Sequence, residues 1–81
     1  MTRQETCQSV TRQIRTLLPD DLKNIKITVR YFGHRGRVIV PQHNKRGVTI
    51  PSMMVEHPDF DLLPSVAAER ITTHVASVSL S

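Results

Sequence analysis

The feature that most constrains this chain is a run of alternating apolar and polar residues over positions 25–40. Because successive side chains of a strand point to opposite faces, this pattern predicts half-buried β-strands. One face would carry Ile25, Ile27, Val29, Tyr31, Val38 and Val40. The other face would carry Lys26, Thr28, Arg30, Phe32, Arg37 and Ile39. The polar segment Gly33-His34-Arg35-Gly36 divides the run, and its two glycines suit the positive φ angles of a tight reversal. An antiparallel hairpin over residues 25–40 is therefore predicted, with Pro41 closing its second strand or placing that strand at an edge.

Amphipathic helices are expected on both sides of the hairpin. Thr2 and Glu5 have the spacing of a capping box, in which both side chains accept hydrogen bonds from backbone amides at a helix start. A helix over residues 3–18 is predicted from apolar residues at three- and four-residue spacing before Pro19, namely Cys7, Val10, Ile14, Leu17 and Leu18. A second helix over residues 63–76, with Pro64 in its first turn, is predicted from Leu63, Val66, Ala67, Ile71, Val75 and Val78. Its β-branched residues leave open whether the last positions fray or pair as a strand.

The segment between hairpin and second helix has a weaker pattern. Residues 43–47 predict a basic loop, and Val48-Thr49-Ile50 is long enough for a short third strand, which stays open at this point. From Ser52 to Phe60 neither the helical nor the strand period prevails, so an irregular segment with a turn is expected.

These elements predict a small single α+β domain over residues 1–81, in the order helix, antiparallel β-hairpin, helix. Both helices would lie on one face of the sheet and bury its apolar side. The opposite face would then show Phe32 and Ile39 among cations. Such a mixture predicts a binding surface, and a second copy of the chain in a homodimer could cover it equally well.

The charge distribution indicates the kind of partner. The formal net charge is +4, yet residues 22–55 contain seven Lys and Arg and no Asp or Glu. A cationic block of this kind favours a polyanion or an acidic protein surface as partner. No apolar run approaches the ~20 residues of a membrane-spanning helix, and the polar N-terminus lacks the apolar core of a signal peptide. We therefore expect a cytoplasmic protein without a membrane partner.

No constellation of side chains predicts catalysis or a cofactor. The single cysteine, Cys7, lies on the apolar stripe of the first helix, where it acts as a small hydrophobe. The histidines are scattered without the spacing of metal ligands, and no Gly-rich phosphate loop precedes a helix. We expect neither metal nor cofactor, and no enzyme activity. The competing hypothesis is a ribonuclease that uses His34 or His43.

Two segments resemble known families. The run GRVIVPQH at residues 36–43 is similar to the end of the sheet in HicA-type toxins, small basic mRNA-cleaving proteins. That resemblance implies a helix–three-strand–helix fold like that of double-stranded-RNA-binding domains. The catalytic histidine that those toxins carry on an earlier strand has no counterpart at residues 25–32. Separately, VTRQIRTLLPD and the following ITVRY resemble the helix and strand of DinI-type regulators of the RecA filament, but that family begins with a strand and ends in a strongly acidic helix.

Two functional hypotheses follow from the basic hairpin. The first is a non-enzymatic nucleic-acid-binding module, for DNA or RNA, whose binding residues are Lys26, Arg30, Phe32, Arg35, Arg37, Lys45 and Arg46. In it the cations contact phosphates and Phe32 stacks on a base. The alternative is a small protein-binding regulator or assembly component, of the kind that mobile elements encode. There the same cations would dock on an acidic protein surface around an apolar centre of Phe32, Ile39, Met53 and Met54.

Overall fold

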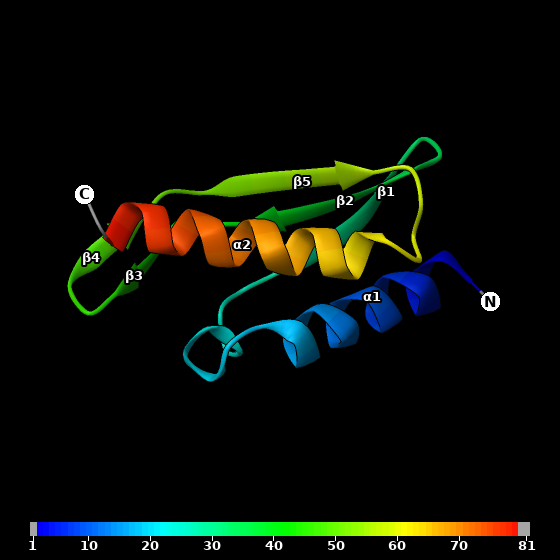
Figure 1. Cartoon of the computed structure of the whole chain (residues 1–81). Helices are drawn as coiled ribbons and strands as arrows, with labels where there is room; N and C mark the ends of the chain where they lie inside the picture. Colours follow the sequence, from blue (N-terminus) through cyan, green and yellow to red (C-terminus); the bar gives the residue numbers. More distant parts are fainter. Residues whose placement is uncertain (1, 80–81) are drawn as a thin grey trace.

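The computed structural model describes residues 2–79 and confirms the α+β class. Two helices, α1 (Arg3–Leu17) and α2 (Leu63–Ser79), pack against each other and against one face of a three-stranded antiparallel sheet (Figure 1). The sheet contains β1 (Thr28–Phe32), β2 (Arg35–Val40) and β5 (Met53–His57), in the order β1-β2-β5. A 3₁₀ turn, η1 (Asp20–Leu22), follows α1, and a separate two-stranded ribbon is formed by β3 (His43–Lys45) and β4 (Val48–Ile50).

Both helices form where the sequence predicts them. The capping box is present, since the Glu5 amide donates to Thr2 Oγ1 at 3.1 Å and the Thr2 amide donates to Glu5 Oε1 at 3.2 Å. Leu18 is extended before Pro19, as the steric clash with a following proline requires. Leu17, predicted on the apolar stripe, is instead 55% exposed. The second helix continues three residues beyond the predicted end at 76, because Val75 and the residues around it pack along the sheet and the ribbon.

The predicted hairpin is confirmed with two changes in its limits. Regular pairing begins at Thr28, although Ile25 and Ile27 still pack against the core from the preceding segment. The reversal is shorter than predicted, since Phe32 pairs with Arg35 and leaves Gly33-His34 as the loop. Gly33 has the expected positive φ of 63°, whereas Gly36 is a buried strand residue. A Cβ on Gly36 would lie 2.5 Å from Leu63 Cδ2, so this glycine permits the close approach of α2 to the sheet.

Strands β2 to β5 form one long hairpin with a gap in it. In both ladders the numbers of paired residues add to 93, as in Val38 with Val55 and Lys45 with Val48. The register therefore continues unchanged from the sheet into the ribbon. The gap lies at residues 41–42 and 51–52, where Pro41 and Pro51 each lack the amide hydrogen that a ladder needs. At the far end, Arg46 and Gly47 have φ angles of 52° and 79°, the two positive values of a type I′ turn.

The side of the hairpin that faces the helices changes across this gap. In β2 and β5 the helix-facing residues include Val38, Val40 and Val55, all buried. Unbroken alternation would turn Thr49 toward the helices and Ile50 away from them. Instead Ile50 is completely buried and Thr49 is exposed. The two prolines thus separate a main half of the hairpin (β2 and β5) from a tip (β3 and β4) of opposite orientation.

Two predictions for residues 43–60 are corrected here. The irregular segment expected at Ser52–Phe60 contains β5, the third strand of the main sheet. Its alternation is hidden because Met53 packs toward the core while Met54, the next residue, is apolar but 54% exposed on the other side. The strand at Val48–Ile50 exists, but it pairs with His43–Lys45, which was predicted as loop, and not with the main sheet. The resulting order of the main sheet and helices is the helix–three-strand–helix order that the toxin resemblance implies.

Candidate binding surface on the open sheet face

The side of the main sheet away from both helices is the candidate site, and we call it the open face. Strand register places on it Thr28, Arg30, Phe32, Arg35, Arg37, Ile39, Met54 and Glu56. These side chains form three rows across the strands. The first contains Phe32 and Arg35, the second Arg30, Arg37 and Glu56, and the third Thr28, Ile39 and Met54. An aromatic end near the β1–β2 turn, a charged middle and an apolar end follow one another along the strands.

Phe32 is the most accessible aromatic group of this surface. The residue is 55% exposed, and the Arg37 guanidinium carbon lies 3.8 Å from the centroid of its ring. Arg37 occupies the position diagonal to Phe32 on the neighbouring strand, where long side chains reach an aromatic ring. This contact is a cation–π stack that covers part of the ring and leaves more than half of the residue open to solvent.

Glu56 holds the arginines of β2 in place. Its Oε1 accepts a hydrogen bond from Arg37 Nε at 2.8 Å and forms an ion pair with Arg37 Nη2 at 2.6 Å, and its Oε2 lies 3.6 Å from Arg35 Nε. Arg30, exposed in the same row, has no ion pair among the residues that the structure describes. With three arginines and one glutamate, the open face carries a formal charge of +2.

Glu56 is a residue of this surface that the sequence pattern does not predict, because residues 53–57 lack a clear strand period. The cationic block appears free of acids along the chain, yet β5 brings a carboxylate beside Arg37 from 19 positions further on. Met54 and Glu56 are two residues apart with Val55 buried between them, which is the alternation of a strand. The apolar character of both Met53 and Met54 concealed it.

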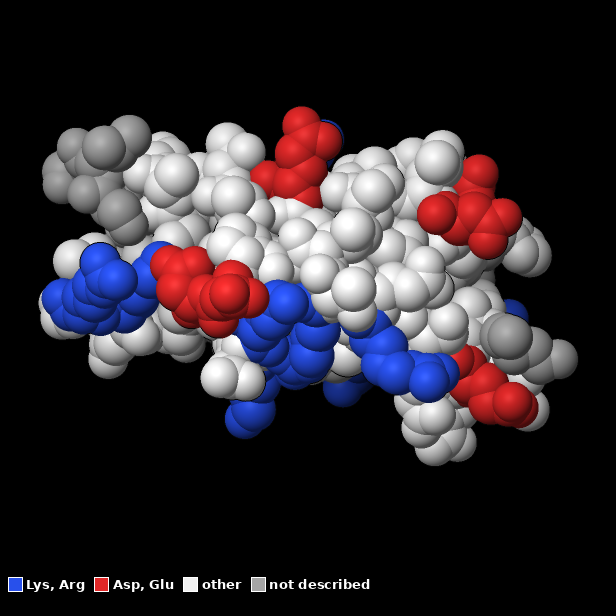
Figure 2. All heavy atoms as spheres, turned by 60° about the horizontal axis from the view of Figure 1, so that its bottom comes forward, with Lys and Arg blue, Asp and Glu red and all other residues white. Residues whose placement is uncertain are grey.

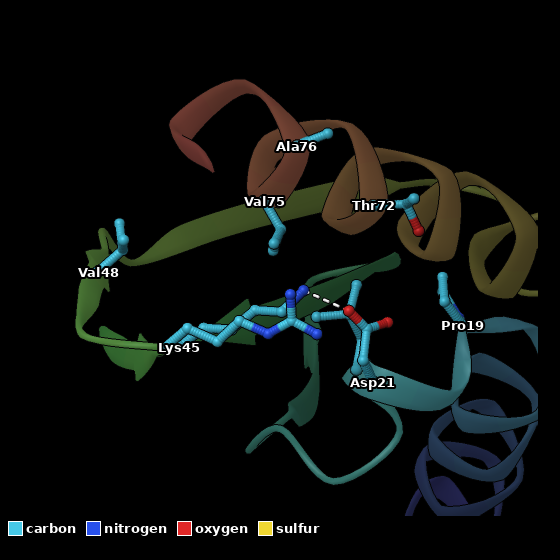
Figure 3. A pocket seen from close by; sticks show the side chains of 9 residues that line it. Pro19, Asp21, Lys45, Val48, Thr72, Val75 and Ala76 are labelled. Atoms are coloured by element: carbon cyan, nitrogen blue, oxygen red, sulfur yellow. Dashed lines mark hydrogen bonds and ion pairs between the residues drawn. The ribbon is translucent and has the colours of Figure 1, made fainter. Parts of the chain in front are cut away.

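The remaining predicted cations lie elsewhere. Lys45, in the tip, forms an ion pair with Asp21 of η1, on the helix side of the molecule (Figure 3). The two line a shallow hollow of about 570 Å³ together with Pro19, Leu22, Arg46, Val48, Thr72, Val75 and Ala76. The hydrogen bond from Lys45 lowers the pKa of the Asp21 carboxyl below its ordinary value. Lys26 is exposed just before β1, and Arg46 is exposed at the tip turn. The structure therefore brings together Arg30, Phe32, Arg35 and Arg37, but it does not add Lys45 to their face.

Other basic and aromatic groups on the helix side have packing roles. Figure 2 shows Lys and Arg side chains spaced along the lower part of that surface, with acidic groups beside them at both ends. Arg15 donates to the carbonyl oxygens of Lys23 and Ile25, at 2.6 and 2.8 Å, and so fixes the connection into β1. Tyr31 stacks on Phe60 with ring centroids 4.5 Å apart, and Arg3 lies over its ring. Tyr31 thus packs on the helix side, and Phe32 is the aromatic residue of the open face.

The groups named in the enzymatic alternative lie apart. His34 is exposed in the β1–β2 turn, and His43 begins β3, with the whole of β2 between them. Nine residues of extended chain span roughly 25–30 Å, so these histidines do not form an acid–base pair. His43 Nδ1 lies 3.4 Å from the Pro41 carbonyl oxygen, and Nε2 has no hydrogen-bond partner among the described residues. Cys7 is half-buried, and burial raises the pKa of its thiol.

The described residues also bear on metal and membrane binding. Residues 2–79 contain no group of three His, Cys, Asp or Glu placed to hold a metal ion. Over the same residues, neither helix combines the length and the apolar character needed to cross a membrane.

Comparisons with known proteins add no family. The chain matches no protein-family model, no curated protein and no solved structure.

Proposed function

We propose that this chain is a non-enzymatic nucleic-acid-binding module that binds through the open face. The observation that carries the proposal is the group of Arg30, Arg35 and Arg37 around an exposed Phe32, on a sheet face that neither helix of the described residues covers. Arginine is suited to this role because its planar guanidinium binds phosphate oxygens through two parallel hydrogen bonds and also stacks on rings.

The charge on this face favours an anionic ligand over a neutral one. Arg30 is exposed and carries no ion pair in the described part of the chain, so phosphate can reach it without displacing a carboxylate. Arg35 is only loosely held at 3.6 Å from Glu56. Lys26, exposed just before β1, adds positive charge at the margin, whereas Arg46 lines the hollow on the helix side.

A salt titration tests the proposal. Binding of mixed DNA and RNA oligonucleotides, followed by fluorescence anisotropy, should weaken with salt with a log–log slope of roughly −3 to −5, as expected for about four to six phosphates. Arg30→Ala should reduce the magnitude of that slope by about one. Arg70→Ala, an exposed arginine on α2, is the matched control and should leave the slope unchanged. Absence of binding at ~50 mM salt would end the proposal.

A second candidate function is a protein-binding regulator or assembly component. It is favoured by the third row of the open face, where the exposed Met54 lies beside Ile39, and by Glu56, which lowers the positive charge. Met53, named for this role from the sequence, packs toward the core on the other side. A stoichiometric complex with an acidic protein, disrupted by Met54→Glu and unaffected by nucleic acid, would establish this function in place of the first.

A further inference from the structure

We infer that the nucleic acid bound on the open face is single-stranded, an inference that rests on the proposed function and narrows its ligand. The rows of the open face lie about 7 Å apart along the strands, two residues of extended chain. Only the middle row is rich in charge. The rows on either side contribute the ring of Phe32 and the apolar side chains of Ile39 and Met54.

A duplex would make poor use of this composition. Its bases are stacked on one another, so a protein reaches mainly phosphates and groove edges, and affinity then depends on the number of cations. The open face supplies three arginines, and Glu56 already binds one of them through a hydrogen bond and an ion pair and lies near a second. Its exposed aromatic and apolar groups would remain without a partner against a phosphate backbone.

A single strand matches the same composition. Unpaired bases expose faces that stack on aromatic rings, and a strand can lay its bases over a flat surface while its phosphates reach the neighbouring cations. Arg37 is already stacked on Phe32 at 3.8 Å and fixed there by Glu56. The ring and guanidinium therefore form a preorganised platform, with Arg35 beside Phe32 and Arg30 opposite Arg37 to contact phosphates.

The shape of the open face agrees with this ligand. Its strands are five or six residues long, and neither helix lies over it, so the main sheet offers no helix for a major groove. The β3–β4 tip is a two-stranded ribbon, a shape that a major groove can admit. Its lysine is held by Asp21 on the helix side, and Arg46, at its turn, lines the same hollow.

The test compares a labelled single strand of roughly 12 nucleotides, oligo(dT) or oligo(U), with a duplex of the same length at ~50 mM salt. We expect the single strand to bind about tenfold tighter than the duplex. Phe32→Leu, which keeps an apolar side chain but removes the ring, should weaken single-strand binding by about tenfold. Phe32→Tyr, which keeps the stacking surface, should change it by less than about twofold. Since Phe32 is more than half exposed, both variants should fold, which circular dichroism can verify.

Each other outcome has a definite meaning. Duplex binding that equals or exceeds single-strand binding, and that falls with Arg46→Ala but not with Phe32→Leu, would overturn this inference and leave the proposed function standing. Failure to bind either form would remove both. A wild-type dimer that Ile39→Glu converts to a monomer, with no nucleic-acid binding in either state, would assign the open face to a second copy of the chain.

Discussion

The main half and the tip of the β2–β5 hairpin share one register but present opposite sides to the helices. In the main half, Val38 and Val55 face the core while Arg37 and Glu56 face away from it. In the tip, Ile50 is buried and Lys45 turns to Asp21 on the helix side. Regular alternation from the main half would have placed both side chains on the side away from the helices. The comparison teaches that the buried side of a hairpin can change where a proline on each strand, here Pro41 and Pro51, interrupts the ladder. Cations of one block are thereby distributed to two sides of the molecule.

The largest expected effect tests this change of orientation. Ile50→Ala should lower the free energy of unfolding by about 2–4 kcal/mol, because it removes buried methyl groups and leaves a cavity. Thr49→Ala is the neighbouring control and should change stability by less than about 0.5 kcal/mol, since Thr49 is exposed. Urea denaturation followed by circular dichroism measures both. A larger loss for Thr49→Ala would mean that alternation runs through the prolines unbroken.

A smaller loss of stability is expected from substituting the glycine of each half, for a different reason in each. Gly36→Ala should cost about 1–3 kcal/mol, because its Cβ would collide with Leu63 Cδ2 at 2.5 Å and Phe60 Cε1 at 3.0 Å. Gly47→Ala meets no atom within 4 Å but must adopt a φ of 79°, at a cost of about 1–2 kcal/mol from the backbone alone.

The two glycine substitutions differ in how they couple to α2. Leu63→Val removes the atom that collides with a Cβ at position 36, so a double-mutant cycle should show a coupling of at least ~0.5 kcal/mol between the two sites. The corresponding cycle between Gly47→Ala and Leu63→Val should show none. Equal coupling in both cycles would contradict the packing role of Gly36.

The smallest effect concerns the ion pair that ties the tip to η1. The pKa of Asp21 is lowered in the folded state from an ordinary value of 3.8, mainly by the hydrogen bond from Lys45. The stabilisation from this carboxylate is therefore complete above the unfolded pKa and is lost as the pH falls through the lower folded pKa. Asp21→Asn should lower the Tm slightly at about pH 6, and the difference from wild type should vanish near about pH 2.

Two controls identify the source of that difference. High salt should reduce it, because the pair lies at the surface. Asp20→Asn alters the adjacent, fully exposed carboxylate, which faces Lys23 at 3.5 Å, and should have a smaller effect on the Tm. A difference that persisted unchanged at acid pH would show that Asp21 does not act through its charge.

Local signals in the sequence were sufficient for the helices and the first hairpin. The Thr2–Glu5 capping box, Pro19 and the alternation around Val29 and Val38 each depend on neighbours within a few residues. The third strand was missed because Met53 and Met54 are both apolar on opposite sides of the sheet. Arg30, Phe32, Arg35 and Arg37 were correctly placed near one another by the hairpin, but the Glu56 contact depends on long-range pairing that local periodicity does not contain.

The way the strands follow one another in the hairpin also affects how the chain can fold. The tip closes over the two residues Arg46 and Gly47, and the main half continues in the same register, so its ladder can grow outward pair by pair. β1 joins through a second two-residue loop. The entropic cost of closing a loop rises with loop length. These two-residue loops therefore keep that cost low as the sheet forms. The packing of α1 on α2 joins the first helix of the chain to the last, so it has the greatest sequence separation among these contacts and raises the contact order most.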